Sequence, residues 1–187
     1  MAKVLEPKDQ KFCSWCGGKL IWQKDALFAT CEACSKNLFP SSKPCTAIFV
    51  KLNNSVLLIR RASDPKKGFL DLPGGFVDLD DESIESGAIR ELSEELSLNL
   101  TNDRLVYLGS NIDKTYVHQN VSVRNLIAYY FIDVSEEEAK SIKLDHENSE
   151  FLWADIKNID DYELAFDCSL PMVNKLKESV NLAAGKN

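Results

Sequence analysis

The sequence of 187 residues contains no run approaching 18 consecutive apolar residues, so no segment is long enough to cross a bilayer as a helix. Its first residues, MAKVLEPKDQK, lack the apolar stretch of a secretory signal. It also shows no internal repeat and no low-complexity tract. A content of 44% hydrophobic and 27% charged residues is typical of a globular chain. We therefore expect a globular, cytoplasmic protein without a membrane partner.

Positive charge is scarce in the C-terminal part of the chain. The net charge of the whole sequence is −7, which argues against general nucleic-acid binding. Residues 1–70 carry 12 basic and 5 acidic side chains, whereas residues 71–187 carry 10 and 24. The acidic excess therefore belongs to one part of the chain, and nucleic acid is not an expected partner.

Four of the six cysteines form two CxxC pairs that are separated by 14 residues: Cys13 with Cys16, and Cys31 with Cys34. A tetrahedral Zn²⁺ takes two thiolates from each of two tight turns, and this spacing resembles a zinc ribbon. Disulfides would need an oxidising compartment, which nothing in the sequence indicates. A redox-active CxxC motif would be expected as a single pair in a βαβ unit, which does not match two pairs. An iron–sulfur centre uses the same four-cysteine ligand set and is the remaining alternative. We interpret the four cysteines as ligands of a structural Zn²⁺.

The chain divides at a segment rich in proline and serine, Pro40-Ser-Ser-Lys-Pro44, which predicts a linker. We expect a ribbon with a polar leader over residues 1–40 and a second domain over residues 44–187. Residues 46–52 and 56–60 are rich in β-branched side chains and flank Asn53-Asn54-Ser55, which predicts a hairpin. Further strands are expected at 105–108, 125–132 and 151–154, and helices at 83–97 and 169–184. Strands and helices in mixed order predict an α/β or α+β domain.

The helix expected at 83–97 carries the densest acidic charge. Glu91, Glu94 and Glu95 have i, i+3 and i+4 spacing, so they project from one face. Like charges so placed destabilise a helix by roughly 0.2–0.5 kcal/mol per pair. Divalent cations would remove that repulsion and use the oxygens as hard ligands. For three glutamates alone, an ordinary solvated acidic face is the simpler alternative. Arg90 offers a planar donor fork that can hold such carboxylates in place.

The segment from Gly75 to Leu98 resembles the Nudix box. The family pattern is Gly, five residues, Glu, seven residues, Arg-Glu, an aliphatic residue, any residue, Glu-Glu, any residue, Gly and an aliphatic residue. Every fixed position from Glu82 to Glu95 matches. Two positions depart: six residues separate Gly75 from Glu82, and Ser97 stands in place of the second glycine. The segment from Arg60 to Gly75 is similar to the sequence that usually precedes the box in this family.

This resemblance implies a Nudix α/β/α sandwich with a mixed sheet, preceded by a zinc ribbon as in NADH pyrophosphatases. It implies hydrolysis of the diphosphate bridge of a nucleoside diphosphate derivative, such as ADP-ribose or NADH, with Mg²⁺ or Mn²⁺. The implied metal ligands are Glu91, Glu94, Glu95 and the Gly75 carbonyl, with Glu82 and Arg90 orienting them. Substrate contacts are expected from Arg60, Arg61, Gly74, Gly75 and Phe76, and a loop base from Glu147 or Glu150.

The sequence leaves the substrate open. The Ser-Gln-Pro-Trp run that NADH pyrophosphatases carry after the box is missing from residues 109–116, so ADP-ribose is as good a candidate as NADH. Because family members often dimerise, a homodimer is a further expectation. The alternative function is a non-catalytic module that senses a nucleotide, with a ribbon that binds a partner or nucleic acid.

Overall fold

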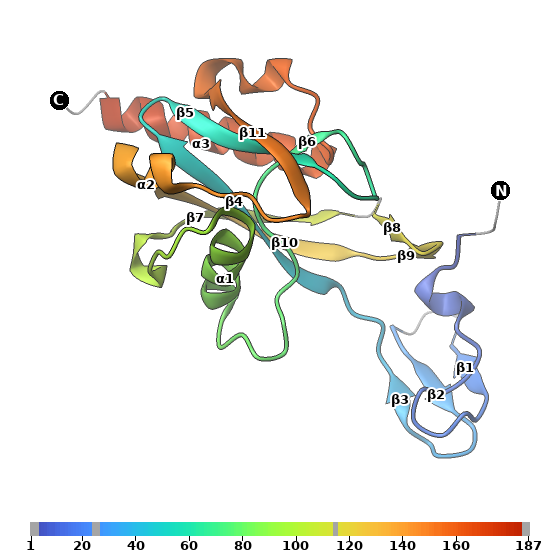
Figure 1. Cartoon of the computed structure of the whole chain (residues 1–187). Coiled ribbons are helices and arrows are strands. Elements are labelled where there is room, and N and C mark those ends of the chain that lie inside the picture. Colours follow the sequence, from blue (N-terminus) through green and yellow to red (C-terminus); the bar gives the residue numbers. More distant parts are fainter. Residues whose placement is uncertain (1–3, 24–26, 114–115, 185–187) are drawn as a thin grey trace. The chain divides into compact units, whose positions relative to one another are not determined.

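The computed structural model describes residues 4–23, 27–113 and 116–184 (Figure 1). The chain forms two compact units, one of Met1–Lys43 with Asp113–Asn125 and one of Pro44–Ile112 with Leu126–Asn187. The expected division into residues 1–40 and 44–187 stays a prediction; in the structure Asp113–Asn125 groups with the N-terminal unit. None of the described helices is long and apolar enough to cross a membrane.

The N-terminal unit is built on a three-stranded antiparallel sheet of β1 (Leu20–Trp22), β2 (Ala29–Cys31) and β3 (Asn37–Leu38). A 3₁₀ turn, η1 (Pro7–Asp9), precedes the sheet. The small hairpin of β8 (Val117–His118) and β9 (Val121–Ser122) joins this unit through a bridge between Leu5 and Val121. The buried core of the ribbon consists of Cys13, Leu20, Ala29 and Cys31. So small a core needs a covalent or metal crosslink to be stable.

The C-terminal unit contains a six-stranded sheet in the order β11-β5-β4-β10-β7, with β6 paired to β5. The strands are β4 (Lys43–Leu52), β5 (Ser55–Arg61), β6 (Leu70–Asp71), β7 (Val106–Asp113), β10 (Asn125–Asp133) and β11 (Asn148–Asp155). The predicted hairpin is confirmed as β4 and β5, which pair antiparallel around a turn in which Asn53 has φ 54°. Asparagine tolerates this left-handed conformation better than most residues, which explains its place in the turn.

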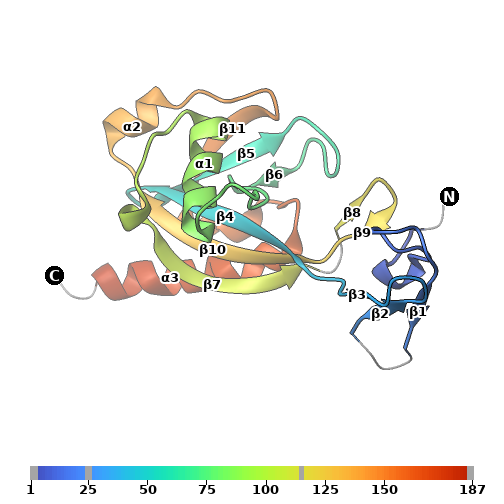
Figure 2. The ribbon, with the colours of Figure 1, turned by 90° about the horizontal axis from the view of Figure 1, so that it is seen from below.

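Helices cover both faces of this sheet, as Figure 2 shows. Alternating side chains of the strands point to opposite faces. Ile48, Val50, Leu57 and Ile59 pack with α1 (Ile84–Leu96), and Phe49, Val56, Leu58 and Tyr129 pack with α3 (Leu170–Ala184). The remaining elements are α2 (Glu136–Ser141), η2 (Asn102–Arg104), η3 (Ile156–Asp161) and η4 (Asp167–Ser169). The predicted α/β/α sandwich is confirmed, and the fold is mixed α/β.

The helix α1 begins and ends at serines. The Ser83 side chain accepts a hydrogen bond from the Ser86 amide and caps the N-terminus. At the C-terminus, Ser97 adopts a left-handed conformation with φ 58°, the position at which the Nudix pattern has glycine. Three residues of the expected apolar stripe, Ala88, Leu92 and Leu96, are fully buried, whereas Ile84 is 37% exposed. Packing of this stripe against the sheet fixes which face of α1 carries its glutamates.

Leu92→Ala is expected to lower the free energy of unfolding by about 2–5 kcal/mol, because it leaves a cavity under α1. Leu79→Ala is the matched control, since Leu79 is fully exposed in the loop before the same helix and its truncation should change stability by no more than about 0.5 kcal/mol. Urea denaturation followed by circular dichroism measures both. Equal effects of the two substitutions would contradict the packing described for α1.

Candidate metal and active sites

Two similar turns present the four cysteine thiols of the N-terminal unit. The Gly17 amide donates to the Cys13 carbonyl at 2.9 Å, and the Ser35 amide donates to the Cys31 carbonyl at 3.0 Å. Gly17 and Ser35 both have positive φ, 73° and 58°, which closes each turn. A Cβ on Gly18 would lie 2.7 Å from the Ala33 Cβ and 3.0 Å from the Cys31 sulfur. Gly18 therefore has to be glycine, because the two cysteine turns lie too close together for a side chain at this position.

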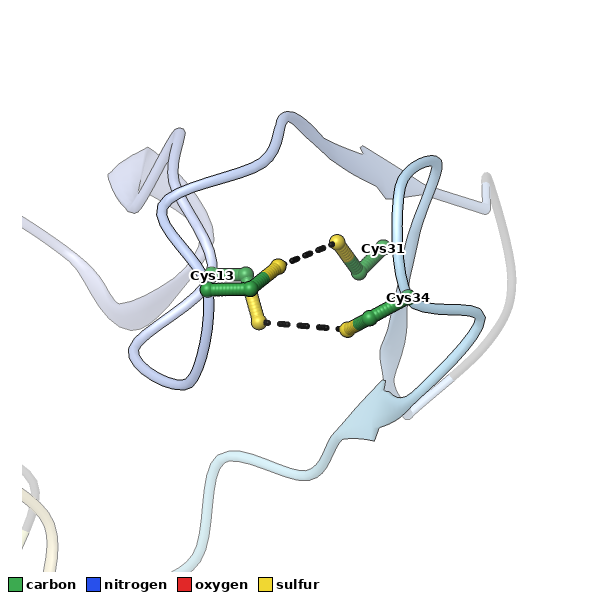
Figure 3. A group of neighbouring side chains, drawn as sticks. Cys13, Cys31 and Cys34 are labelled. Carbon is green, nitrogen blue, oxygen red and sulfur yellow. Dashed lines mark hydrogen bonds between the residues drawn. The ribbon is translucent and has the colours of Figure 1, made fainter.

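The four sulfur atoms form one cluster, as the CxxC spacing predicts (Figure 3). All lie within 4.8 Å of one another. The Cys13 and Cys34 sulfurs are 3.9 Å apart, and those of Cys16 and Cys31 are 3.6 Å apart. Four thiolates at the Zn–S bond length of about 2.3 Å would place their sulfurs about 3.8 Å apart at the corners of a tetrahedron. The spacing fits Zn²⁺ and is far longer than the disulfide bond of about 2.05 Å.

The pKa values of these thiols also favour a metal cation bound between them. The Cys34 backbone amide lowers the pKa of Cys31 to about 7, even though burial acts in the opposite direction. For Cys16, the Gly18 amide lowers the pKa, but the neighbouring thiols outweigh it and raise the pKa to about 12. Crowded thiols cannot all ionise without a positive ion among them, and a bound metal displaces their protons.

We expect the purified protein to hold about one equivalent of zinc, and Cys31→Ser to lose most of it. Metal content measured by mass spectrometry, together with circular dichroism, tests this. Cys45→Ser is the matched control, because Cys45 lies in the C-terminal unit outside the four-sulfur cluster. Zinc binding that survives in Cys31→Ser would contradict the ligand set.

Arg90 organises the acidic face of α1 with all five of its N–H groups. Its Nε and Nη2 each donate to Asp81, both at 3.1 Å, and Nη2 also donates to the Phe76 carbonyl at 2.9 Å. Its Nη1 donates to Glu91 at 3.0 Å and to Glu94 at 2.8 Å. These contacts, led by the hydrogen bond to Asp81, raise the pKa of Arg90 and keep the guanidinium charged. Arg90 thus joins the glycine turn to the glutamates of the helix.

Asp81, and not Glu82, is the acidic partner of Arg90. The Asp81 side chain is only 8% exposed, and its hydrogen bond to Arg90 lowers its pKa. Glu82 is exposed and makes no hydrogen bond or ion pair among the described residues. Five residues lie between Gly75 and Asp81, which is the spacing of the Nudix pattern. The expectation that Glu82 helps to orient the glutamates stays a prediction, while Asp81 is the residue of this loop that contacts the Arg90 guanidinium.

Glu95 is the most enclosed carboxylate of the helix, with 8% exposure. Its Oε2 accepts from the Gly74 amide at 2.8 Å, and its Oε1 accepts from the Asn148 side chain at 3.2 Å. Burial nevertheless raises the pKa of Glu95 to about 8. Asn148 is itself buried and also donates to Asp145 at 3.2 Å. The sequence gives no sign of this role for Asn148, because nothing in the pattern at the start of β11 sets its amide apart from its polar neighbours.

The glycine turn packs directly on Glu91. A Cβ on Gly75 would lie 2.6 Å from a Glu91 carboxylate oxygen, and one on Gly74, whose φ is 138°, would lie 2.3 Å from the Thr46 carbonyl. Gly74 therefore accepts no side chain, whereas a side chain at Gly75 would displace the Glu91 carboxylate. The Gly75 carbonyl accepts the Thr46 amide at 2.8 Å, so one of its lone pairs is already used. Phe76, which follows in the turn, is 42% exposed.

The other residues expected at the site divide into two groups. The negative charge of Glu147 lies near enough to Glu91 to add to the rise of its pKa, which burial chiefly causes and which reaches about 6. Glu150 instead pairs with Arg60 across β11 and β5. Arg61 donates to Asp71 at 3.0 Å and lies over the Phe166 ring. Glu147 thus acts on Glu91 through its charge alone, while Glu150 and both arginines make ion pairs of their own.

The donor set of α1 fits a hard divalent cation. Among the described residues, the four cysteines are the one group of three or more His, Cys, Asp or Glu side chains whose ligand atoms lie within 4.8 Å of one another. The glutamates of α1 are held apart from such a cluster: Arg90 binds Glu91 and Glu94, and Gly74 and Asn148 bind Glu95. The pKa values of Glu91 and Glu95 are nevertheless raised to about 6 and about 8 by burial. The buried Glu95 has no cationic side chain hydrogen-bonded to it, and the partly buried Glu91 shares Arg90 with Glu94 and Asp81, so this pair of carboxylates is suited to bind Mg²⁺ or Mn²⁺.

Comparison with known proteins assigns the family. The model of the NUDIX domain matches residues 42–171, which include the glycine turn, α1 and the loop before β11. The chain belongs to the Nudix family.

Several curated relatives of this Nudix chain are bacterial. The NAD-capped RNA hydrolase NudC of Photobacterium profundum is 32% identical over 95 residues, which make up 51% of this chain and 35% of that protein. The protein of the same name from Pectobacterium atrosepticum is 25% identical over 99 residues, or 53% of this chain and 37% of that protein. The matched segments thus span little more than a third of the length of these relatives.

Solved structures agree on the fold. The NUDIX domain of Shewanella oneidensis NrtR, determined with ADP ribose, superposes with a TM-score of 0.61 at 22% identity and covers 76% of this chain and 90% of that one. A NUDIX hydrolase of Nitrosomonas europaea gives a TM-score of 0.60 at 24% identity, with 90% and 89% covered. At these identities the likeness establishes the Nudix fold of the chain and nothing finer.

Proposed function

We propose that this Nudix protein is a metal-dependent hydrolase that cleaves the diphosphate bridge of a nucleoside diphosphate derivative. One observation carries the proposal: the buried Glu95 and the partly buried Glu91 of α1 both lie against the glycine turn, Glu95 through a hydrogen bond from the Gly74 amide and Glu91 beside Gly75. Buried carboxylates with raised pKa values are uncommon outside functional sites. A site of this kind, next to Arg90, suits a divalent cation and a diphosphate.

Each residue of the proposed site has a separate task. Glu91 and Glu95 would hold Mg²⁺ or Mn²⁺, with Glu94 beside them, and the bound ion would polarise the phosphoryl oxygens and lower the pKa of a water molecule. Arg90 and Asp81 orient the carboxylates, and Asn148 fixes the Glu95 side chain. Between the two candidate loop bases we favour Glu147, because its charge lies near Glu91 whereas Glu150 is paired with Arg60. In the N-terminal unit, Zn²⁺ would be structural.

The substrate class we propose is a dinucleotide or a nucleotide sugar with an adenosine diphosphate part. The curated relatives are named for NAD-capped RNA, and a solved NUDIX domain of the same fold was determined with ADP ribose. NADH, NAD⁺ and ADP-ribose share the bridge between two phosphorus atoms at which water would attack. The exposed Phe76 next to the turn is a candidate for stacking on the base.

A substrate panel tests the proposal. NADH, ADP-ribose, FAD, a diadenosine polyphosphate and ATP are each incubated with the full chain and Mg²⁺ or Mn²⁺, and the products are separated by chromatography. We expect AMP from NADH or ADP-ribose, and no product when the added cation is left out. Tight binding of these compounds without turnover would replace the hydrolase with the alternative function, a module that senses nucleotides.

A further inference from the structure

The N-terminal unit exposes large aromatic side chains beside lysines, although its core is very small. Phe12 is 63% exposed and Trp15 is 71% exposed, and they flank Cys13 in the first cysteine turn. Trp15 contributes only its backbone to the turn, where its amide donates to the Cys13 sulfur at 3.4 Å. Neither ring is therefore needed to fill the core of the ribbon. Exposed aromatic rings of this size are enriched where proteins bind other molecules.

The lysines of this unit lie next to those rings. Lys8, Lys11 and Lys19 line a cleft of about 280 Å³ together with Phe12 and Trp22. The walls of the cleft are held together by the bridge between Phe12 and Lys19 and by a hydrogen bond of 2.8 Å from the Trp22 indole to the Gln10 carbonyl. The Lys36 ammonium lies 5.1 Å from the centre of the Trp15 ring. Basic groups thus accompany both exposed aromatic side chains.

These four lysines have no acidic partner among the residues that the structure describes, and all four are exposed. The one acidic side chain in the cleft, Asp9, accepts the Glu6 amide at 2.9 Å and thereby caps the turn η1. Three lysines against this one carboxylate still leave the cleft with a positive charge that can meet an anion outside the chain. The acidic total of the whole sequence conceals this, since residues 1–43 carry seven basic and four acidic side chains.

We propose that this ribbon surface, made of Lys8, Lys11, Phe12, Trp15, Lys19 and Lys36, binds single-stranded nucleic acid. Unpaired bases stack on exposed aromatic rings, and the phosphates between them pair with lysines. Phe12 and Trp15 are three residues apart, so their Cα atoms are at most about 11 Å apart, within reach of neighbouring bases of one strand. A duplex keeps its bases stacked inside and leaves the rings without a partner. On this proposal the ribbon has a binding role in addition to holding a structural Zn²⁺.

Fluorescence anisotropy of a labelled 12-nucleotide uridine RNA with a 5′-hydroxyl end tests the proposal. Such an RNA has no diphosphate bridge, so binding to it does not depend on the carboxylate site. The full, zinc-loaded chain should bind this strand at least about tenfold more tightly than a duplex of the same length or an inorganic polyphosphate. Equal binding of all three would overturn the proposal, because charge alone would then account for it.

Two classes of variant separate stacking from charge. Phe12→Ala and Trp15→Ala should each raise the Kd by roughly 5- to 100-fold and leave its salt dependence unchanged. Lys11→Ala and Lys19→Ala should each reduce the slope of log Kd against log salt by about 0.7. Tyr107→Ala and Lys140→Ala are the matched controls, because both side chains are exposed in the C-terminal unit. The zinc content of each variant shows whether its ribbon is folded. An unchanged Kd for the RNA in a folded Trp15→Ala protein would contradict the proposal.

Discussion

Glu95→Gln is expected to lower the turnover of the best substrate in the panel by at least about a hundredfold. The substitution replaces one oxygen of a buried carboxylate with an amide nitrogen, which cannot bind a cation. Loss of residues that merely orient metal ligands already costs about 10–100-fold in many sites, so loss of a ligand should cost at least as much. Initial rates measured over a range of Mg²⁺ concentrations give this value. Glu137→Gln, in an exposed part of α2, is the matched control and should keep full activity.

The fold should survive this substitution, since burial already favours the neutral form of Glu95. Its pKa rises from an ordinary value of 4.5 to about 8, so without a divalent cation the folded chain binds this proton more tightly than the unfolded chain does. A raised folded-state pKa stabilises the protein below pH 4.5, and that contribution is lost as the pH rises through 8. In buffer without Mg²⁺, Glu95→Gln should therefore gain stability relative to the unchanged chain between pH 5 and pH 8.

Urea denaturation at these two pH values measures the stability difference, and the activity assay is run on the same preparations. Unchanged turnover in a folded Glu95→Gln protein would remove Glu95 from the proposed metal site. A variant that is inactive because it is unfolded would instead contradict the pKa argument. The two measurements together thus distinguish a loss of chemistry from a loss of structure.

The regular elements of the C-terminal unit could be predicted from periodicity and turn residues. The apolar stripe and the serine caps of α1 are local features, so residues 83–97 indicate the helix to within one residue at each end. The strand expected at 151–154 runs from Asn148 to Asp155, because pairing with β5 extends it beyond its apolar centre. The expected helix at the C-terminus is observed as α3, with Ser169 in the preceding 3₁₀ turn.

Contacts between distant segments were beyond the reach of the sequence. The short helix α2 has no apolar stripe, and the β8–β9 hairpin has only two residues in each strand, so neither gives a clear pattern. Asn148 reaches Glu95 across 53 positions of the chain, and no local signal marks such a pair. The four-cysteine cluster is the opposite case, because metal ligands must occur as closely spaced pairs and the spacing itself discloses them.

The Asp81 position shows how one added residue is accommodated. Asp81→Asn is expected to raise the half-saturating concentration of Mg²⁺ by about 10–100-fold and to lower turnover, whereas Glu82→Gln should change both less than about twofold. An amide at position 81 presents one oxygen to the two N–H groups of Arg90 that now share a carboxylate. Arg90 would then be freer to pair with Glu91 and Glu94 and would compete with the cation for them. Metal titration of initial rates for the three proteins measures the difference.

Removal of Asp81 altogether should be less harmful than its substitution. In the shortened chain five residues separate Gly75 from Glu82, and the spacing of seven residues from Glu82 to Arg90 is unchanged. Glu82 would then lie where Asp81 now meets the guanidinium, and its longer carboxylate can accept the same pair of N–H groups. The deletion protein should therefore keep more activity than Asp81→Asn, and its half-saturating Mg²⁺ concentration should be closer to that of the unchanged chain. If the deletion instead proves the more damaging change in a folded protein, the loop needs its extra residue for a reason other than the contact with Arg90.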